Sequence, residues 1–306
     1  MKTSTITHWE KKIEHAIALS HDDPFGERDV RTVAAMIAES YDNFSHKFVE
    51  MYGESYVHFA KRRRLEAGAG YLRHSDFSVK QIAEVCGYTH SSFTKGFREL
   101  YNESPVSFRD RLYLPNEAYT LEETSRATTP HNDPQHLIFS IDRTLNVSLP
   151  DYILYYNILP QNNNPVKSMV EYMGRYQQEL HTINAVLQLS GAMVITGTLD
   201  VVPVTSYSKM MMYVGILVPQ ESAYDRAHRQ MQLTFQESHG LYTKMIPGGS
   251  YKKLPVPMSF VAAGLPMYQF INTSCRSGHF KMSGNHFFIS LTGIDHCEIF
   301  IPRQKR

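Results

Sequence analysis

The clearest pattern along the chain is a repeat of apolar and polar positions in its first third. When residues 30–59 are paired with residues 79–108, an offset of 49, ten of the thirty pairs are identical. The identical pairs are Val30/Val79, Ala34/Ala83, Phe44/Phe93, Phe48/Phe97, Glu50/Glu99, Tyr52/Tyr101, Glu54/Glu103, Ser55/Ser104, Val57/Val106 and Phe59/Phe108. A fixed period with matching apolar positions indicates one supersecondary unit that is used twice.

In each copy, the pattern predicts a short helix that ends in a tight turn. Asp29 and Ser78 stand at equivalent places and are favoured N-caps, because their side-chain oxygens accept hydrogen bonds from free helix N–H groups. An apolar face follows at helical spacing in both copies. Gly87 permits the left-handed backbone of a tight turn, whereas Ala38 holds the equivalent place in the first copy and specifies that turn less well.

A second helix with one aromatic face and one small, polar face is predicted after each turn. Phe44 and Phe48 are four residues apart, as are Phe93 and Phe97, so each pair is expected to be buried on one face. The polar positions between the aromatics are Asp42, Asn43, Ser45 and His46 in the first copy, and Ser91, Ser92, Thr94 and Lys95 in the second. This arrangement indicates a helix-turn-helix.

Two such units, joined by one helix over roughly residues 56–72, favour binding to double-stranded DNA. Their second helices can enter successive major grooves on one face of a duplex, about 34 Å apart. The alternative is a tandem helical hairpin that packs against another protein. The candidate DNA-binding residues are Asp42, Asn43, Ser45, His46, Arg62, Ser91, Ser92, Thr94, Lys95 and Arg98.

The overall charge does not favour this interpretation. The chain has 31 basic and 30 acidic residues, and residues 1–112 contain 16 of each, so there is no global excess to attract phosphates. A basic surface must therefore come from clustering. The run from Lys61 to Arg64 is the densest cluster, and Lys95 and Arg98 follow it.

The remainder of the chain has a different pattern. Residues 113–145 contain many polar residues and prolines and are predicted to be a linker. Beyond them, the order strand, helix, strand, strand occurs twice. The predicted elements are strand Tyr152–Leu159, helix Val166–Leu189, strands Met193–Val202 and Met210–Val218, then strand Leu241–Lys253, a helical region Met258–Ile271, and strands His286–Thr292 and Cys297–Ile301. This order predicts an α+β domain of two similar halves over residues 146–306.

Residues 28–110 resemble the DNA-binding domain of the AraC/XylS family. Residues 77–109 are similar to the second helix-turn-helix of that family almost throughout, and end in its characteristic Ser-Pro-x-x-aromatic-Arg. The resemblance implies a transcription regulator that binds DNA, with RNA polymerase as a further candidate partner. The family often has Trp, Gln or Arg in its first recognition helix where this chain has Asp42, Ser45 and His46. A carboxylate is repelled by phosphates, although it can accept from a cytosine amino group.

Residues 150–306 resemble the GyrI-like effector-binding domains that accompany several bacterial DNA-binding modules. Residues 246–251 are similar to the Pro-Gly-Gly-x-Tyr strand entry of that family, and residues 297–302 to its closing strand. The resemblance implies a small hydrophobic, often cationic, effector bound between the two halves, with Glu298 in the pocket. The fold class is therefore expected to be multidomain, with an all-α tandem helix-turn-helix DNA-binding domain over residues 1–112 and an α+β GyrI-like domain.

Strand alternation places Glu298 and Phe300 on one face and Cys297, Ile299 and Ile301 on the other. A carboxylate beside aromatic rings suits an organic cation. Glu298 also fits an edge-strand surface carboxylate, and methionines 210–212 also fit ordinary core packing. The candidate effector-binding residues are Glu298, Phe300, Tyr213, Tyr251 and Met211.

Composition excludes several other classes. The three cysteines are scattered and odd in number, which is typical of a reducing compartment. No apolar stretch is long enough to cross a bilayer, and the N-terminus does not have the pattern of a signal peptide, so a cytoplasmic protein is expected. No cofactor, metal site or catalytic residue is expected. The alternatives for the C-terminal domain are a small-molecule hydrolase, with Glu298 handling the proton of water, and a protein-interaction module.

Overall fold

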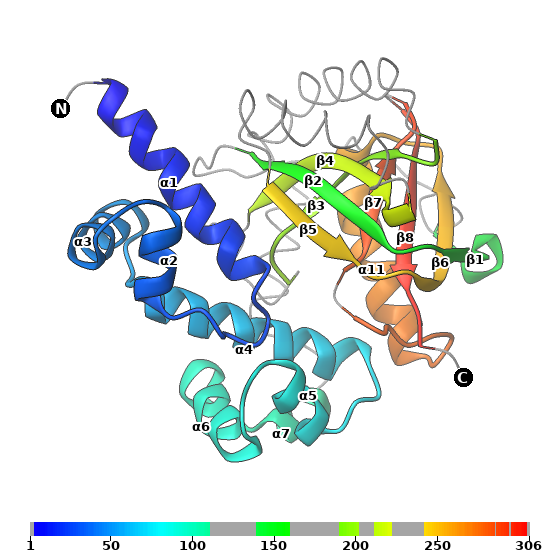
Figure 1. Cartoon of the computed structure of the whole chain (residues 1–306). Helices are drawn as coiled ribbons and strands as arrows, with labels where there is room; N and C mark the ends of the chain where they lie inside the picture. Colours follow the sequence, from blue (N-terminus) through cyan, green and yellow to red (C-terminus); the bar gives the residue numbers. More distant parts are fainter. Residues whose placement is uncertain are drawn as a thin grey trace. The chain divides into compact units, whose positions relative to one another are not determined.

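The computed structural model describes residues 3–110, 139–159, 190–201, 211–221, 242–284, 286–293 and 295–304. The chain divides into two compact units (Figure 1). The first unit comprises Met1–Leu72 and Phe77–Arg111, and the second comprises Arg73–Asp76 and Leu112–Arg306. Each unit is described by itself below.

The first unit is all-helical, and its helices confirm the repeat. They are α1 (Thr3–His21), α2 (Val30–Met36), α3 (Tyr41–Tyr52), α4 (Tyr56–His74), α5 (Val79–Val85), α6 (His90–Tyr101) and α7 (Pro105–Asp110). The bounds of α5 and α6 follow those of α2 and α3 at the same offset of 49 that relates the sequences. Helix α1 was not predicted, although Trp9, Ile13 and Ala16 are buried at helical spacing along it.

The caps and turns of the two copies are also alike. The predicted N-caps Asp29 and Ser78 accept from the backbone N–H three residues on. Alanine specifies such a turn less well than glycine does, yet the two turns have the same geometry. Ala38 has a φ of 55° and Gly87 has a φ of 70°, both in the left-handed region. The first copy thus holds an alanine in a conformation that favours glycine.

We expect Ala38→Gly to raise the free energy of unfolding of the first unit by about 1 kcal/mol, because a non-glycine residue in the left-handed region costs roughly 1–2 kcal/mol. Ala35→Gly, in the exposed last turn of α2, is the matched control and is expected to lower it by about 1 kcal/mol. Urea unfolding followed by the fluorescence of Trp9, the single tryptophan, measures both. A destabilised Ala38→Gly variant would contradict the account.

The same experiment distinguishes the two turns. At Gly87 an added Cβ would collide with the carbonyl group of Phe25, in addition to being strained by the positive φ. Gly87→Ala is therefore expected to lower the free energy of unfolding by more than Ala35→Gly does.

Each copy of the repeat has its own aromatic core. In the first copy the rings of Phe48 and Phe59 lie 5.4 Å apart, and in the second the equivalent rings of Phe97 and Phe108 lie 5.1 Å apart. All four side chains are fully buried. These clusters fix each second helix against the helix that follows it.

The second unit contains one antiparallel sheet of eight described strands (Figure 1). They are β1 (Leu145–Leu149), β2 (Tyr152–Ile158), β3 (Met193–Thr198), β4 (Met212–Pro219), β5 (Tyr242–Ile246), β6 (Gly249–Val256), β7 (Phe288–Leu291) and β8 (Cys297–Pro302). Their order in the sheet is β1-β6-β8-β7-β3-β4-β2-β5. The predicted strands correspond to β2, β3, β4, β7 and β8, and the one predicted over Leu241–Lys253 is divided into β5 and β6. The predicted helix Val166–Leu189 lies outside the described residues.

The sheet consists of two halves with the same pairing. In one half β2 pairs with β4 and β4 with β3, and in the other β6 pairs with β8 and β8 with β7. The halves meet where β3 pairs with β7. The order of the predicted elements is thus matched by a repeated strand topology.

A short break interrupts two long strand segments at equivalent places, with two residues between β1 and β2 and two between β5 and β6. The antiparallel register continues across it, since Leu149 pairs with Gly249 on one side and Tyr152 pairs with Ile246 on the other. The four strands therefore behave as one long antiparallel pair with a break at its centre.

The structure differs from two element boundaries that were predicted from the sequence. The single strand expected over Leu241–Lys253 is two strands, because Pro247 has no N–H to donate and Gly249 adopts a positive φ of 127°. In addition, β1 begins at Leu145, the last residue of the expected linker. Within that linker, residues 113–138 lie outside the described residues.

Helix α11 (Phe260–Arg276) covers one face of the sheet (Figure 1) and forms the main core with it. Ile299 and Ile301 of β8 and Val214 and Ile216 of β4 belong to this core. Side chains alternate between the two faces of a strand, so Glu298 and Phe300 lie on the face opposite α11. This agrees with the alternation predicted for this strand.

Candidate nucleic-acid interface and effector-binding face

The polar faces of α3 and α6 are the candidate interface with nucleic acid. Most of the predicted residues on them are exposed, and Ser45 and Thr94 are half-buried. The exposed ones are Asp42, Asn43, His46, Ser91, Ser92, Lys95 and Arg98. These side chains project from two helices whose opposite faces are anchored by buried phenylalanines.

The start of α3 is held by contacts to α1. Lys12 Nζ forms an ion pair with Glu39 at 2.5 Å and also donates to the carbonyl oxygen of Ala38 at 3.1 Å. The second carboxylate oxygen of Glu39 accepts from Asn43 Nδ2 at 2.8 Å. The lysine beside Glu39 is the main reason that the pKa of this carboxyl lies below its usual value. Asn43 is thus positioned by a chain of charge-assisted contacts.

The start of α6 is held by its own N-cap. Thr89 Oγ1 accepts from the Ser92 backbone N–H at 3.2 Å and lies 2.8 Å from Ser92 Oγ. Further along, the side chains of Lys95 and Arg98 form no ion pair among the described residues. Both are exposed, so α6 presents two cations to solvent.

The run from Lys61 to Arg64 has a different role from the one that its charge suggested. All four residues are half-buried and contact other parts of the first unit. Lys61 pairs with Glu99 at 3.1 Å, Arg63 Nη2 lies 3.3 Å from His21 Nδ1, and Arg64 Nη1 donates to the Phe25 carbonyl oxygen at 3.0 Å.

Arg62 is the candidate DNA-binding residue that does not lie with the others. Its guanidinium pairs with Glu54 at 2.6 Å and with Glu66 at 2.9 Å, and its side chain is only 13% exposed. The carboxylates keep the pKa of Arg62 above its usual value despite burial, so Arg62 stays charged. A buried, doubly paired arginine does not offer an accessible charge, and removing one of its partners would leave a buried charge uncompensated.

Arg109, which ends the Ser-Pro-x-x-aromatic-Arg pattern, is also engaged inside the unit. Its Nη2 donates to the carbonyl oxygen of Phe77 at 2.5 Å and its Nε to that of Leu72 at 3.4 Å. The motif therefore connects α7 to the end of α4 and to the segment between α4 and α5.

Four of the five candidate effector-binding residues lie on the sheet face opposite α11. The register places Glu298 and Phe300 beside Lys253 of β6, while Tyr251 and Tyr213 share their face. The rings of Phe300 and Phe288 are stacked at 4.9 Å. Aromatic side chains thus line this face from β4 to β6.

Glu298 is neutralised by a neighbour that the sequence did not reveal. Lys253 Nζ lies 2.7 Å from Glu298 Oε1 and 5.6 Å from the centre of the Phe300 ring. A lysine therefore occupies the position between carboxylate and aromatic ring that was expected to suit a cationic effector. The diagonal pairing of Lys253 with Glu298 depends on strand register, which the sequence does not specify.

Tyr213, Tyr251 and Met211 are all buried. Burial raises the pKa of both phenols well above the ordinary value, so they remain neutral. Tyr251 Oη donates to the Pro247 carbonyl oxygen at 2.6 Å, and the backbone N–H of Met211 donates to Asp200 at 2.5 Å.

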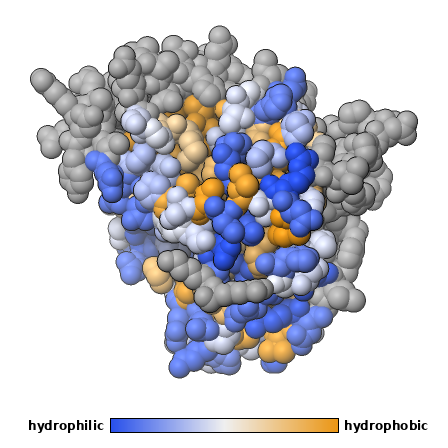
Figure 2. Space-filling model, turned by 90° about the vertical axis from the view of Figure 1, so that its right-hand side faces the viewer, coloured by the Kyte–Doolittle hydropathy of each residue, from blue (hydrophilic) through white to orange (hydrophobic). Residues whose placement is uncertain are grey.

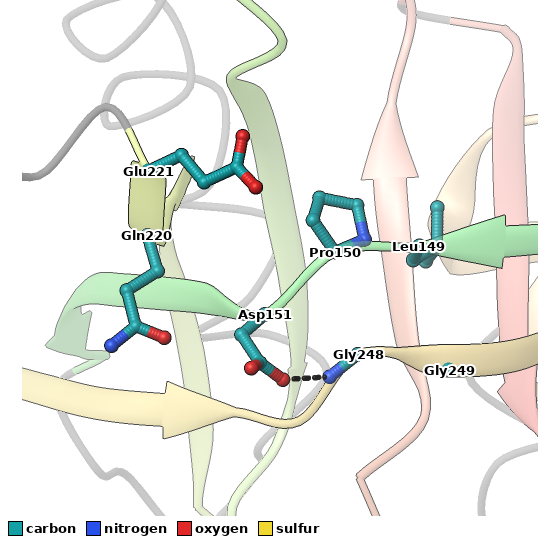
Figure 3. A pocket seen from close by; sticks show the side chains of 7 residues that line it. All are labelled: Leu149, Pro150, Asp151, Gln220, Glu221, Gly248 and Gly249. Carbon is teal, nitrogen blue, oxygen red and sulfur yellow. Dashed lines mark hydrogen bonds between the residues drawn. The ribbon is translucent and has the colours of Figure 1, made fainter.

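A pocket of about 500 Å³ lies at the break in the long strand pair (Figure 3). Asp151 Oδ1 accepts from the Gly248 N–H at 2.6 Å across it. None of the candidate effector-binding residues lines it. Its lining residues are Leu149, Pro150, Asp151, Gln220, Glu221, Gly248 and Gly249. Pro150 and the sequence Pro247-Gly248-Gly249 are turn-forming residues that can be recognised in the sequence. That they lie next to each other depends on the strand register, which the sequence does not specify.

Figure 2 shows small apolar patches interspersed with polar residues on the face turned to the viewer. Among the described residues, no group of three His, Cys, Asp or Glu side chains is placed to hold a metal ion. The three cysteines are buried and free, and burial raises the pKa of each thiol to about 12. No described helix is both long and apolar enough to span a membrane.

Comparison with known proteins identifies the class of the first unit. Residues 33–111 match the family model described as a helix-turn-helix domain, which is of the AraC type. The chain thus contains an AraC-type helix-turn-helix domain followed by an antiparallel sheet domain. No curated protein matches the chain.

Several solved structures show partial similarity to the chain. An AraC-type transcriptional regulator from Chromobacterium violaceum is 20% identical and covers 35% of this chain and 96% of its own, with a TM-score of 0.33. The DNA-binding domain of AdpA, solved with a target DNA, is 24% identical over 32% of this chain and 88% of its own, with a TM-score of 0.31. A hydrolase from Listeria innocua is 7% identical over 53% of this chain and 92% of its own, with a TM-score of 0.34.

The sheet domain is expected to lose stability as the pH falls from 6.5 to 4. Burial, and secondarily Lys244, lowers the pKa of His286 from 6.5 to about 4. In this window the unfolded chain binds a proton that the folded chain does not, so stability is full above pH 6.5 and falls by on the order of 2–3 kcal/mol towards pH 4.

Urea unfolding followed by the near-ultraviolet dichroism of the tyrosines checks this. His286→Gln, which cannot titrate, is expected to flatten the dependence between pH 4 and pH 6.5. An unchanged dependence in the variant would assign the pH effect to other groups.

Proposed function

We propose that this protein binds double-stranded DNA through α3 and α6 and regulates transcription, by contact with RNA polymerase or by excluding it. The observation that carries the proposal is the repetition of one helix-turn-helix unit at a constant offset, with an exposed polar face on the second helix of each copy. One chain then offers two recognition helices to successive major grooves.

The cations that form no ion pair within the first unit also support DNA binding. The half-buried run from Lys61 to Arg64 is engaged within the unit, and Lys47 of α3 pairs with Glu50. The cations that the recognition helices offer to phosphates are therefore Lys95 and Arg98. Such contacts release counterions, so affinity falls linearly in log salt, by about 0.9 per phosphate neutralised.

The test is DNA affinity at several salt concentrations. Lys95→Ala with Arg98→Ala is expected to make the salt slope shallower by about 1.8 and to weaken binding by roughly 10- to 100-fold at 0.1 M salt. Lys11→Ala with Arg303→Ala removes two charges outside α3 and α6 and is the matched control, expected to bind as wild type does. If the wild-type chain binds no duplex, the tandem unit is a protein-interaction module.

We further propose that the second unit is a GyrI-like domain whose aromatic sheet face binds a small, flat, hydrophobic molecule. The repeated pairing of two half-sheets and the shared face of Glu298, Phe300, Tyr213 and Tyr251 support this. Because Lys253 already neutralises Glu298, an uncharged aromatic ligand fits the face better than a cation does. Binding would then change the DNA affinity of the first unit.

Titration with 1-aminoanthracene, an uncharged aromatic fluorophore, tests the effector site. We expect saturable binding that Phe300→Ala weakens at least about tenfold, since stacking and buried area are both lost. Phe139→Ala, which removes a ring that packs against α11 on the opposite face, is the control. Equal affinities in the two variants would place the site elsewhere, and unchanged DNA affinity at saturation would remove the proposed coupling.

A further inference from the structure

The two recognition helices differ in charge at equivalent exposed positions. At the constant offset of 49, three exposed positions of α3 correspond to three exposed positions of α6, and at each of them the α6 residue is more positive by one charge. The three pairs are Asp42/Ser91, His46/Lys95 and Val49/Arg98. With His46 neutral, these positions carry a charge of −1 on α3 and +2 on α6.

Neighbouring charges do not cancel this difference. On α3, Lys47 pairs with Glu50 at 2.7 Å, and on α6, Glu99 pairs with Lys61 at 3.1 Å. These pairs are each neutral. Asp42 forms no ion pair within the described part of the chain, so its charge remains on the surface that α3 presents.

The helices match in length, caps and buried aromatics, and apart from the pair Lys47/Gly96, which is not exposed, the charge difference lies in the outer face. Both have twelve residues, a Ser or Thr N-cap, and a left-handed C-cap, at Gly53 and Asn102. If both faces contacted DNA for the same purpose, the same charges would be expected. A carboxylate in the major groove is unfavourable except where it meets a hydrogen-bond donor, and cytosine presents its N4 amino group there.

From this asymmetry we infer a division of work between the two helix-turn-helix units, in which one provides affinity for DNA and the other provides sequence discrimination. Helix α6 supplies the attraction for phosphates through Lys95 and Arg98. Helix α3 opposes non-specific binding and supplies discrimination, because Asp42 is accepted only where a cytosine amino group faces it. Asn43, held by Glu39 and through it by Lys12, lies beside Asp42 in a fixed orientation. This inference rests on the DNA binding proposed above.

Two exchange variants test the division, measured on a duplex selected from a random pool with the wild-type chain and on a random duplex of equal length. The first exchange gives α3 the charges of α6, as Asp42→Ser, His46→Lys and Val49→Arg. The second gives α6 the charges of α3, as Ser91→Asp, Lys95→His and Arg98→Val. Thermal unfolding of both variants checks that the first unit is folded.

The first exchange is expected to strengthen binding to the random duplex by roughly tenfold or more at 0.1 M salt and to steepen its salt slope, while the ratio of the two affinities falls at least about tenfold. Asp42→Asn alone is expected to lower that ratio, chiefly on duplexes where a cytosine of the selected site has been replaced. The second exchange is expected to weaken binding to both duplexes by at least about tenfold.

Equal losses of affinity in the two exchange variants, with an unchanged ratio, would overturn the division of work and leave DNA binding intact. A ratio that Asp42→Asn does not alter would overturn the role of Asp42. Absence of binding by the wild-type chain to any pool member would overturn the proposed function itself, and the division with it.

Discussion

The two recognition helices are both held by α4, through buried packing such as that of Phe48 on Phe59 and through contacts of four consecutive cations along α4. Lys61 contacts α6, Arg62 bridges Glu54 and Glu66, Arg63 contacts His21 of α1, and Arg64 contacts the segment before α2. Each of these groups has lost part of its hydration and is compensated by a fixed partner. Because these contacts reach α1, α6 and the segments before α2 and α4, α4 links the two copies of the repeat.

The same contacts decide which charges remain for a partner. A run of four basic residues in a sequence suggests a surface that binds nucleic acid, but a charge that is paired inside the fold attracts few phosphates. Among the described residues, the exposed charges of the recognition helices that form no ion pair are two cations on α6 and one carboxylate on α3. The electrostatic character of the interface is therefore set by the exposed residues of twelve-residue helices, rather than by the most basic stretch of the chain.

Much of the first unit could be predicted because the sequence itself repeats at a constant offset of 49 residues. Buried phenylalanines and capping residues recur at matched positions, and local rules are sufficient to place them. The geometry at Ala38 was less predictable, because its left-handed turn is imposed by packing of the repeat unit and not by the preference of alanine. The pairing of Arg62 with both Glu54 and Glu66 also depends on the fold, because sequence spacing alone identifies only the i,i+4 partner Glu66.

In the second unit, alternation along β8 assigned Glu298 and Phe300 to one face, since a strand has a period of two. Their neighbour Lys253 could not be found in this way, because it comes from β6 and its position depends on register. The Pro-Gly-Gly sequence at residues 247–249 indicates a break in the strand. That the break lies opposite the one between β1 and β2 depends on the strand pairing. Long-range registers are set by the whole sheet, so the sequence predicted the strands better than the site between them.

The central claim is that one chain uses two recognition helices on one face of a duplex. Hydroxyl-radical footprinting of the selected duplex, together with the stoichiometry of the complex, tests it most directly. The account predicts two protected segments centred about one helical turn, roughly 10 base pairs, apart at one chain per duplex. A single protected segment, or protection that requires two chains, would contradict it.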